Sequence, residues 1–145
     1  MELREVLTPK NMLVTLGFIV ILMSLWGMTH GDEWAEIGWG EDNVLAHDEA
    51  YEEMWALHLM PLGVMAIVTA LLVTGKELAK VAMFAPLVLV NMIGGMLILT
   101  RENGYGGTPT GVSAALAGLM MLATLLTCVS GFMHKTEKVG AEAVE

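Results

Sequence analysis

The chain has 145 residues, of which 55% are hydrophobic, and its 16 acidic and 7 basic residues give a net charge of −9. Nucleic acids and anionic lipid surfaces bind basic proteins, so neither is expected as a partner of this acidic chain. The single cysteine, Cys128, excludes an intrachain disulfide. Most of the chain is apolar, which leaves no room for a separate soluble domain of ordinary size.

Four apolar stretches divide the chain. Each is about 20 residues long, which matches the hydrocarbon thickness of a bilayer and predicts a transmembrane helix. The fold class that we expect is all-α: one integral membrane four-helix bundle over residues 1–145, with residues 134–145 as a flexible cytoplasmic tail. The predicted spans are approximately residues 11–29, 54–75, 81–100 and 111–133.

The basic residues lie almost entirely on one side of these spans. Lys and Arg in short loops mark the cytoplasmic side of a membrane. Only Arg101 falls on the other side, which predicts a protein of a prokaryotic plasma membrane with both termini in the cytoplasm. The basic residues on the predicted cytoplasmic side are Arg4, Lys10, Lys76, Lys80, Lys135 and Lys138.

The first stretch has basic residues before it, as a secretory signal does. It is longer than the apolar region of a signal peptide, however, and the residues after it do not form an Ala-x-Ala cleavage site. Pro9 suits the first turn of a helix. We therefore expect a transmembrane helix that is retained.

Residues 30–53 form the acidic extracytoplasmic loop that we expect between the first and second helices. The loop contains nine acidic residues, and all four tryptophans and both tyrosines of the chain lie at or beyond this membrane boundary. Such rings settle at the headgroup level, so the loop is expected to lie on the membrane surface. Asp42 or Asn43 can cap a helix that continues through His47 into the second span.

The remaining connections are short. The link between the second and third spans is placed at residues 76–80, and a link of this length makes the two helices antiparallel neighbours. The third span contains Pro86 and is followed by a tight polar loop at residues 101–109.

The acidic loop contains the best candidate for a metal site, because imidazole and carboxylate groups together suit transition metals. On one helix His47 and His58 would stand about 16 Å apart along the axis, so a single ion would need ligands from different segments. The alternative is that these acids form a solvated face of the protein. The candidate ligands for a divalent cation are His30, Asp32, His47, Glu49, Glu52, Glu53 and His58.

Two other metal chemistries are weighed against ordinary structural roles. His58 lies three residues before Pro61, and with His30 it would permit axial ligation of a haem between helices. A histidine hydrogen-bonded at the membrane boundary is the preferred interpretation, and haem is not expected. The 13 methionines include soft ligands suited to Cu(I), but their scattered spacing is typical of gap-filling in an apolar core.

Asn91 is the one strongly polar side chain near the middle of a span. An unpaired amide in hydrocarbon costs free energy, so we expect a hydrogen bond to another helix, for example to Thr69 or Thr124. Small residues in the third and fourth spans allow helices to approach closely. The predicted packing residues are Asn91, Gly94, Gly95, Gly111, Ala114, Ala115 and Gly118.

No motif determines a reaction, and enzymatic activity is not expected. The favoured function is a structural or accessory subunit of a larger membrane complex, in which the acidic face binds a partner or cations. One alternative is a homo-oligomeric cation channel with Glu52 and Glu53 at its mouth. The other is a metal- or haem-binding membrane redox protein that uses His30, His47 and His58.

Overall fold

The structure is a computed structural model, and it describes residues 3–100, 102 and 104–136. Every regular element in these residues is a helix. The helices are α1 (Leu3–Val6), α2 (Pro9–Thr29), α3 (Gly31–Trp39), the 3-10 helix η1 (Glu41–Asn43), α4 (Asp48–Leu72), α5 (Gly75–Thr100) and α6 (Gly111–His134).

Four of these helices, α2, α4, α5 and α6, are long and apolar enough to cross a membrane. The expectation of an all-helical protein with four candidate membrane helices is therefore confirmed. The side of the membrane on which each end lies stays a prediction. Arg101 and residues 137–145 of the predicted tail lie outside the described residues.

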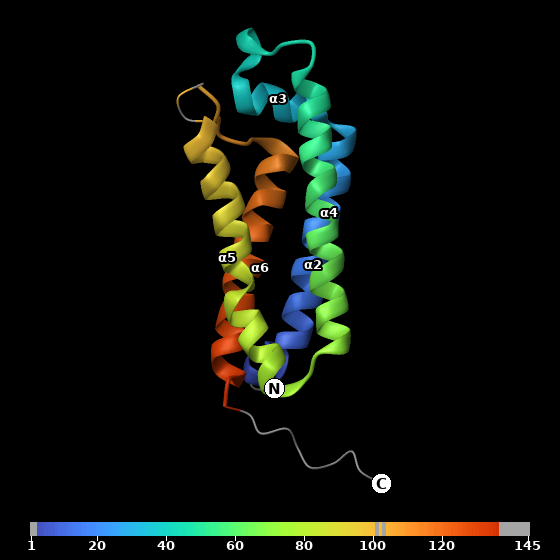
Figure 1. The fold of residues 1–145 in the computed structure, drawn as a ribbon, viewed down its shortest axis with the longest axis vertical. Helices are drawn as coiled ribbons and strands as arrows, with labels where there is room; N and C mark the ends of the chain where they lie inside the picture. Colours follow the sequence, from blue (N-terminus) through green and yellow to red (C-terminus); the bar gives the residue numbers. More distant parts are fainter. Residues whose placement is uncertain (1–2, 101, 103, 137–145) are drawn as a thin grey trace.

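The four long helices lie side by side, and α3 crosses one end of the bundle (Figure 1). We call this end the α3 end. At the opposite end, called the terminal end, lie α1 and the last turn of α6. Because α3 and the α5–α6 loop both lie at the α3 end, side chains far apart in the sequence meet there.

The backbones of α2 and α4 are in close contact. A Cβ atom added to Gly17 would lie 2.6 Å from the Gly63 carbonyl oxygen, and one added to Gly63 would lie 2.7 Å from that of Gly17. Nearer the α3 end, the Ser24 hydroxyl donates to the Ala56 carbonyl over 2.6 Å. Small residues allow this approach, and the hydrogen bond sets the register of the two helices.

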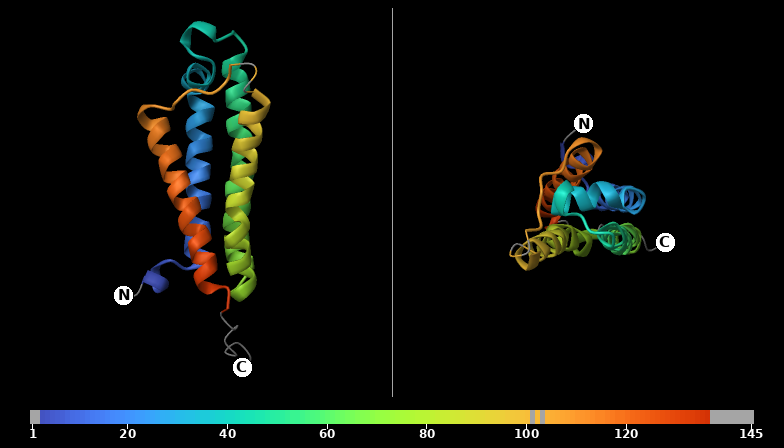
Figure 2. Two further views of the ribbon diagram at one scale, coloured as in Figure 1. Left: turned by 90° about the vertical axis from the view of Figure 1, so that its left-hand side faces the viewer. Right: turned by 90° about the horizontal axis from the view of Figure 1, so that it is seen from above.

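α5 and α6 touch near the terminal end and diverge toward the α3 end (Figure 2, left). At the point of contact, a Cβ atom on Gly131 would lie 2.5 Å from the Ala79 carbonyl oxygen. Nearer the α3 end, a Cβ atom on Gly94 or Gly118 would meet nothing within 4 Å in the described part of the chain. The divergence leaves a wedge between the two helices.

The connection between α4 and α5 differs from the predicted link at residues 76–80. α4 ends at Leu72 and α5 begins at Gly75, whose φ of +61° lies in the left-handed region that favours glycine. Lys80 therefore lies inside α5, where its Nζ pairs with Glu77 Oε1 at 3.0 Å. The charged residues lie before the third apolar stretch but inside its helix.

α4 also begins later than the predicted cap at Asp42 or Asn43. Both of these residues belong to η1, and α4 begins at Asp48. The Leu45 N–H donates to Asp48 Oδ2 over 2.7 Å, which anchors the chain just before the helix. Gly40, with a φ of +81°, marks the end of α3.

Candidate functional site

Two of the predicted histidine ligands, His30 and His58, each form a hydrogen bond with the backbone one turn earlier in the chain. The His30 ring stacks on Trp26 with centroids 3.6 Å apart, and its Nδ1 lies 3.1 Å from the Trp26 carbonyl oxygen. His58 is exposed, and its Nδ1 is hydrogen-bonded to the Met54 carbonyl oxygen one turn earlier. Each ring therefore has one nitrogen directed at the backbone.

The other predicted ligands are dispersed over the surface of the α3 end. Asp32 and Glu49 are exposed and Glu53 is half-buried. His47 is exposed, with its Nε2 3.6 Å from Asp48 Oδ1. Within the described ranges, no three His, Cys, Asp or Glu side chains are close enough together to hold a metal ion. The cation site and the haem ligation stay predictions.

Glu52 differs from the other predicted ligands because only 6% of its surface is exposed. The Tyr105 hydroxyl, in the α5–α6 loop, donates to Glu52 Oε1 over 2.8 Å. The Trp39 ring packs edge-on against Tyr105, with centroids 5.0 Å apart. The carboxyl group of Glu52 thus holds the loop against α4 and does not face solvent.

The α5–α6 loop also lies directly on α3. The Tyr105 ring covers Gly38, and Gly107 lies against the Ile37 carbonyl, so a side chain at either glycine would clash. The Gly106 N–H donates to the Gly38 carbonyl over 2.7 Å. Together α3 and the loop form a cap over the α3 end of the bundle, and we use the word cap for these two segments.

Hydrogen bonds attach the cap to two of the long helices, α4 and α6. Burial raises the pKa of the Tyr105 phenol, and the neighbouring Glu52 carboxylate raises this pKa further. The phenol therefore stays protonated at neutral pH and remains a hydrogen-bond donor to Glu52. On α6, the Ser113 hydroxyl donates to Glu33 Oε1 over 2.7 Å. Both carboxyl groups serve as acceptors within the fold.

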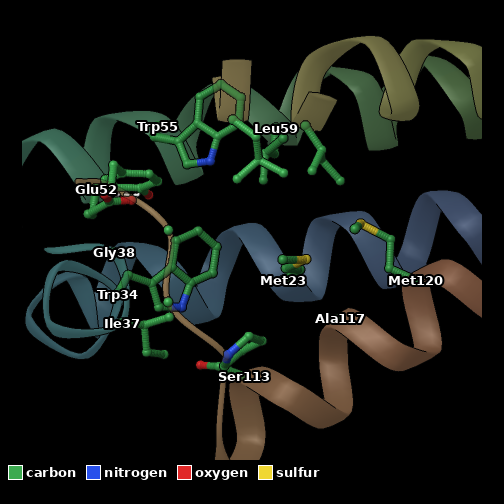
Figure 3. Close-up of a pocket in the computed structure, with 16 residues that line it drawn as sticks. Met23, Trp34, Ile37, Gly38, Glu52, Trp55, Leu59, Ser113, Ala117 and Met120 are labelled. Carbon is green, nitrogen blue, oxygen red and sulfur yellow. Dashed lines mark hydrogen bonds between the residues drawn. The ribbon is translucent and has the colours of Figure 1, made fainter. Parts of the chain in front are cut away.

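A cavity of about 300 Å³ lies beneath the cap, in the wedge between α5 and α6. Figure 3 shows Trp55 of α4 and Trp34 of α3 on two sides of it, with Glu52 toward the cap and Met23 and Met120 toward the middle of the bundle. The walls are largely apolar. Small-molecule sites typically have volumes of roughly 300–1,000 Å³ with apolar walls and a few polar groups, as here.

The Trp34 indole nitrogen is buried and has no hydrogen-bond partner among the described residues. A buried N–H without an acceptor costs free energy. The Trp34 ring lines the cavity, but this nitrogen is itself buried and offers no surface to a molecule inside the cavity. Trp26 has a similar buried N–H, but its side chain is not part of the cavity wall.

The residues predicted to pack helices together mostly lie away from the helix contacts. Ala115 is exposed and Ala114 is half-buried. The close contacts are made by Gly17, Gly63 and Gly131, which were not predicted. Each is an isolated glycine among bulky apolar residues, and that is the signal that would have identified them. The predicted glycines at which an added Cβ would meet nothing within 4 Å in the described residues are Gly94, Gly95, Gly111 and Gly118.

Asn91 is exposed on α5. The expected hydrogen bond to Thr69 or Thr124 is not found among the described residues, and the buried Thr124 hydroxyl has no partner there. The prediction failed because α5 presents Asn91 on a face directed away from the bundle. This face of α5 and the cavity are the features of the described residues that bear most directly on function.

No protein-family model matches the chain, and no similar protein was found among curated proteins or solved structures. Function is therefore inferred from the residues of this chain alone.

Proposed function

We propose that this chain is an accessory subunit of a membrane complex and that α5 binds a transmembrane helix of another subunit. The observation that supports the proposal is the exposed amide of Asn91 within an apolar helix. Lipid chains offer no hydrogen-bond partner in the hydrocarbon layer, so a polar side chain there is satisfied by another protein segment or by lining a water-filled cavity.

The residues around Asn91 form a stripe of the kind that helix pairs use. Five residues follow one another at spacings of three, four, four and three, which places them on one face of α5. Gly95 lies one turn from Asn91, where an added Cβ would have open space, so a partner backbone can approach closely. We call these five residues the Asn91 stripe: Phe84, Leu87, Asn91, Gly95 and Ile98.

The charge of the chain favours a different protein over a second copy. The predicted extracytoplasmic loop carries nine acidic residues, and only Arg101 is basic on that side. Two parallel copies would bring these acids together, which is unfavourable. The partner we propose carries a hydrogen-bonding side chain, small residues beside it, and basic residues next to the α3 end.

Native mass spectrometry of the protein purified from its own membranes in mild detergent tests the proposal. We expect a heteromeric complex, and we expect Asn91→Leu to weaken the association by about three- to fifteenfold, the range of interhelical hydrogen bonds in membranes. Met121→Leu is the matched control, because Met121 is exposed on α6 outside the Asn91 stripe.

Two results would overturn the proposal. One is a lone monomer, or a heteromeric complex that Asn91→Leu leaves unchanged. The other is a pure homo-oligomer, which would favour the cation channel, or the redox protein if metal or haem were bound to it.

A further inference from the structure

We infer that the cavity beneath the cap binds an amphiphilic organic cation, whose ammonium group meets the carboxyl group of Glu52 and whose apolar body fills the rest of the cavity. This role is separate from the proposed contact of α5 with another subunit, because the cavity lies between the helices of this chain. Three features support it: a carboxyl oxygen open to the cavity, the aromatic walls, and the apolar wedge between α5 and α6.

The carboxyl group of Glu52 supplies the negative charge. Glu52 lines the cavity, although only 6% of its surface is exposed. Its Oε1 accepts the hydrogen bond from Tyr105, whereas Oε2 accepts none from the described residues. Oε2 is nevertheless not one of the buried side-chain atoms that lack a partner, so this oxygen keeps accessible surface. A molecule inside the cavity can therefore reach it.

A second carboxyl group adds to the negative potential at this end of the cavity. Asp48 lies one turn before Glu52 on the same face of α4, and only 4% of its surface is exposed. The Leu45 N–H, which donates to Asp48 Oδ2, is a neutral partner. Opposite charges attract more strongly where water is excluded, so a positive group near these carboxyl groups is stabilised.

The aromatic walls also suit an ammonium group. Trp34 and Trp55 stand on two sides of the cavity (Figure 3), and Tyr105 lines its cap end. A cation within about 6 Å of the centre of such a ring is attracted by its electron-rich face, and tryptophan attracts it most strongly. This contact uses the ring of Trp34 and makes no demand on its buried nitrogen.

The rest of the cavity is apolar and suits the body of the ligand. Met23 and Met120 line it toward the middle of the bundle, and Ile93, Leu97 and Ala117 line it where α5 and α6 diverge (Figure 2, left). A ligand dissolved in the bilayer can enter between these two helices, and burial of its apolar body is favourable. An inorganic cation would leave this space unfilled, and the described residues bring no three ligands together for a metal ion.

Binding is tested with the full chain reconstituted in phosphatidylglycerol nanodiscs, and protein-free nanodiscs of the same lipid are used to subtract partition into the bilayer. The probes are benzyltrimethylammonium and neopentylbenzene, which has the same shape with carbon in place of the charged nitrogen. We expect saturable binding of benzyltrimethylammonium with one molecule per chain. At equal concentration in the lipid, neopentylbenzene should bind more weakly by about tenfold or more, because it lacks the charge that the carboxylate and the rings attract. Equal affinities would overturn the inference.

Glu52→Gln tests the charge and keeps the attachment of the loop, because the amide oxygen can accept the hydrogen bond from Tyr105. We expect it to weaken the binding of benzyltrimethylammonium by about tenfold or more and to leave that of neopentylbenzene unchanged. Glu33→Gln is the matched control, because Glu33 also accepts a hydrogen bond at the α3 end, from Ser113, but does not line the cavity. Wild-type affinity in Glu52→Gln, or an equal loss in the two variants, would overturn the inference.

A second pair of variants tests the position of the ligand. Ala117→Leu fills the cavity and is expected to abolish saturable binding, while Ala115→Leu, on the exposed side of the same helix, leaves it unchanged. Circular dichroism shows whether each variant folds, and Glu52→Gln keeps the test decisive if Ala117→Leu does not. Undiminished binding in a folded Ala117→Leu variant would overturn the inference.

Two further measurements separate other sources of the positive charge. Arg101 lies outside the described residues, and its guanidinium group is a positive charge that the chain itself can supply. Saturable binding that appears only in Arg101→Gln would show that the chain fills the site itself, and would overturn the inference. Phosphatidylcholine titrated into the nanodiscs identifies the origin of the ligand. Competition with benzyltrimethylammonium assigns the site to a lipid headgroup and its absence assigns the site to a free amine, and either result supports an organic cation.

Discussion

The hydrogen bond between Glu52 and Tyr105 joins residues 53 positions apart in the sequence. Glu52 is one of nine acidic residues in residues 30–53, and the sequence does not distinguish it from the others. Asp48, one turn earlier on the same face of α4, is also buried, with 4% of its surface exposed. The approach of the α5–α6 loop places Tyr105 on Glu52, whereas Asp48 accepts a hydrogen bond from the Leu45 N–H beside it.

The raised pKa of Tyr105 gives a prediction at the residue scale. In a Tyr51→Phe variant, Tyr105 is the remaining tyrosine, so tyrosinate absorbance reports on it alone. We expect the folded protein to titrate with a midpoint above the ordinary value of 10.0, because burial disfavours the phenolate.

The sign of the linkage follows from this direction. The folded pKa lies above the unfolded one, so the contribution of Tyr105 to stability is fully present below about pH 10 and is lost as the pH rises through the folded pKa. The denatured protein serves as the control and should titrate near pH 10. A folded midpoint equal to the denatured one would show that Tyr105 is not buried against Glu52.

At the scale of elements, the four candidate membrane helices are apolar on nearly every face. In a water-soluble bundle one face of each helix is polar, and the apolar face identifies the core. Here both lipid and protein interior are apolar, so hydropathy does not separate the two faces. The positions at which two backbones touch, such as Gly17 with Gly63, are therefore decided by the packing of the helices.

Substitution of Gly17 by alanine tests the contact of α2 with α4. The added Cβ would meet the Gly63 carbonyl oxygen at 2.6 Å, and backbone cannot move aside as a flexible side chain can. We expect the free energy of unfolding in detergent to fall by about 1–3 kcal/mol, the usual cost of overpacking.

Gly118→Ala is the matched control for this change. An added Cβ at Gly118 would meet nothing within 4 Å in the described residues, so its effect should stay within about 0.5 kcal/mol. Equal losses from the two substitutions would indicate a general intolerance of alanine in these helices and not a specific contact between α2 and α4.

At the scale of the whole molecule, the two ends of the bundle differ in construction. The cap, formed by α3 and the α5–α6 loop, covers the α3 end, and the carboxyl groups of Glu52 and Glu33 hold it in place. The terminal end carries α1 and the close contact of α5 with α6 at Gly131. Thus α5 and α6 are in contact at the terminal end, and the space between these two helices lies at the α3 end.

The orientation of the molecule in its membrane is tested with single cysteines. In a Cys128→Ser background, we expect Asp42→Cys to react with a membrane-impermeant maleimide on intact cells, and Thr136→Cys to react only after the cells are permeabilised. The physical reason is the excess of Lys and Arg at the terminal end, which predicts that this end stays in the cytoplasm. The reverse pattern of labelling would contradict the predicted topology.

The sequence by itself determined that the chain forms four helices long and apolar enough to cross a membrane, and approximately where they lie. Span length and hydropathy are local properties, because each helix satisfies its own backbone hydrogen bonds within the bilayer. Helix ends were less well predicted, since a charged residue such as Lys80 lies outside the apolar stretch and yet inside the helix.

Only the tertiary structure decided which of the singled-out residues meet. It buried Glu52 against Tyr105, left Asn91 exposed, and placed Trp34 in the wall of a cavity between diverging helices. None of this could be read from composition or spacing, because each arrangement depends on how segments far apart in the chain approach one another. A helix that is apolar all round does not specify which of its faces meets lipid, a neighbouring helix or a ligand.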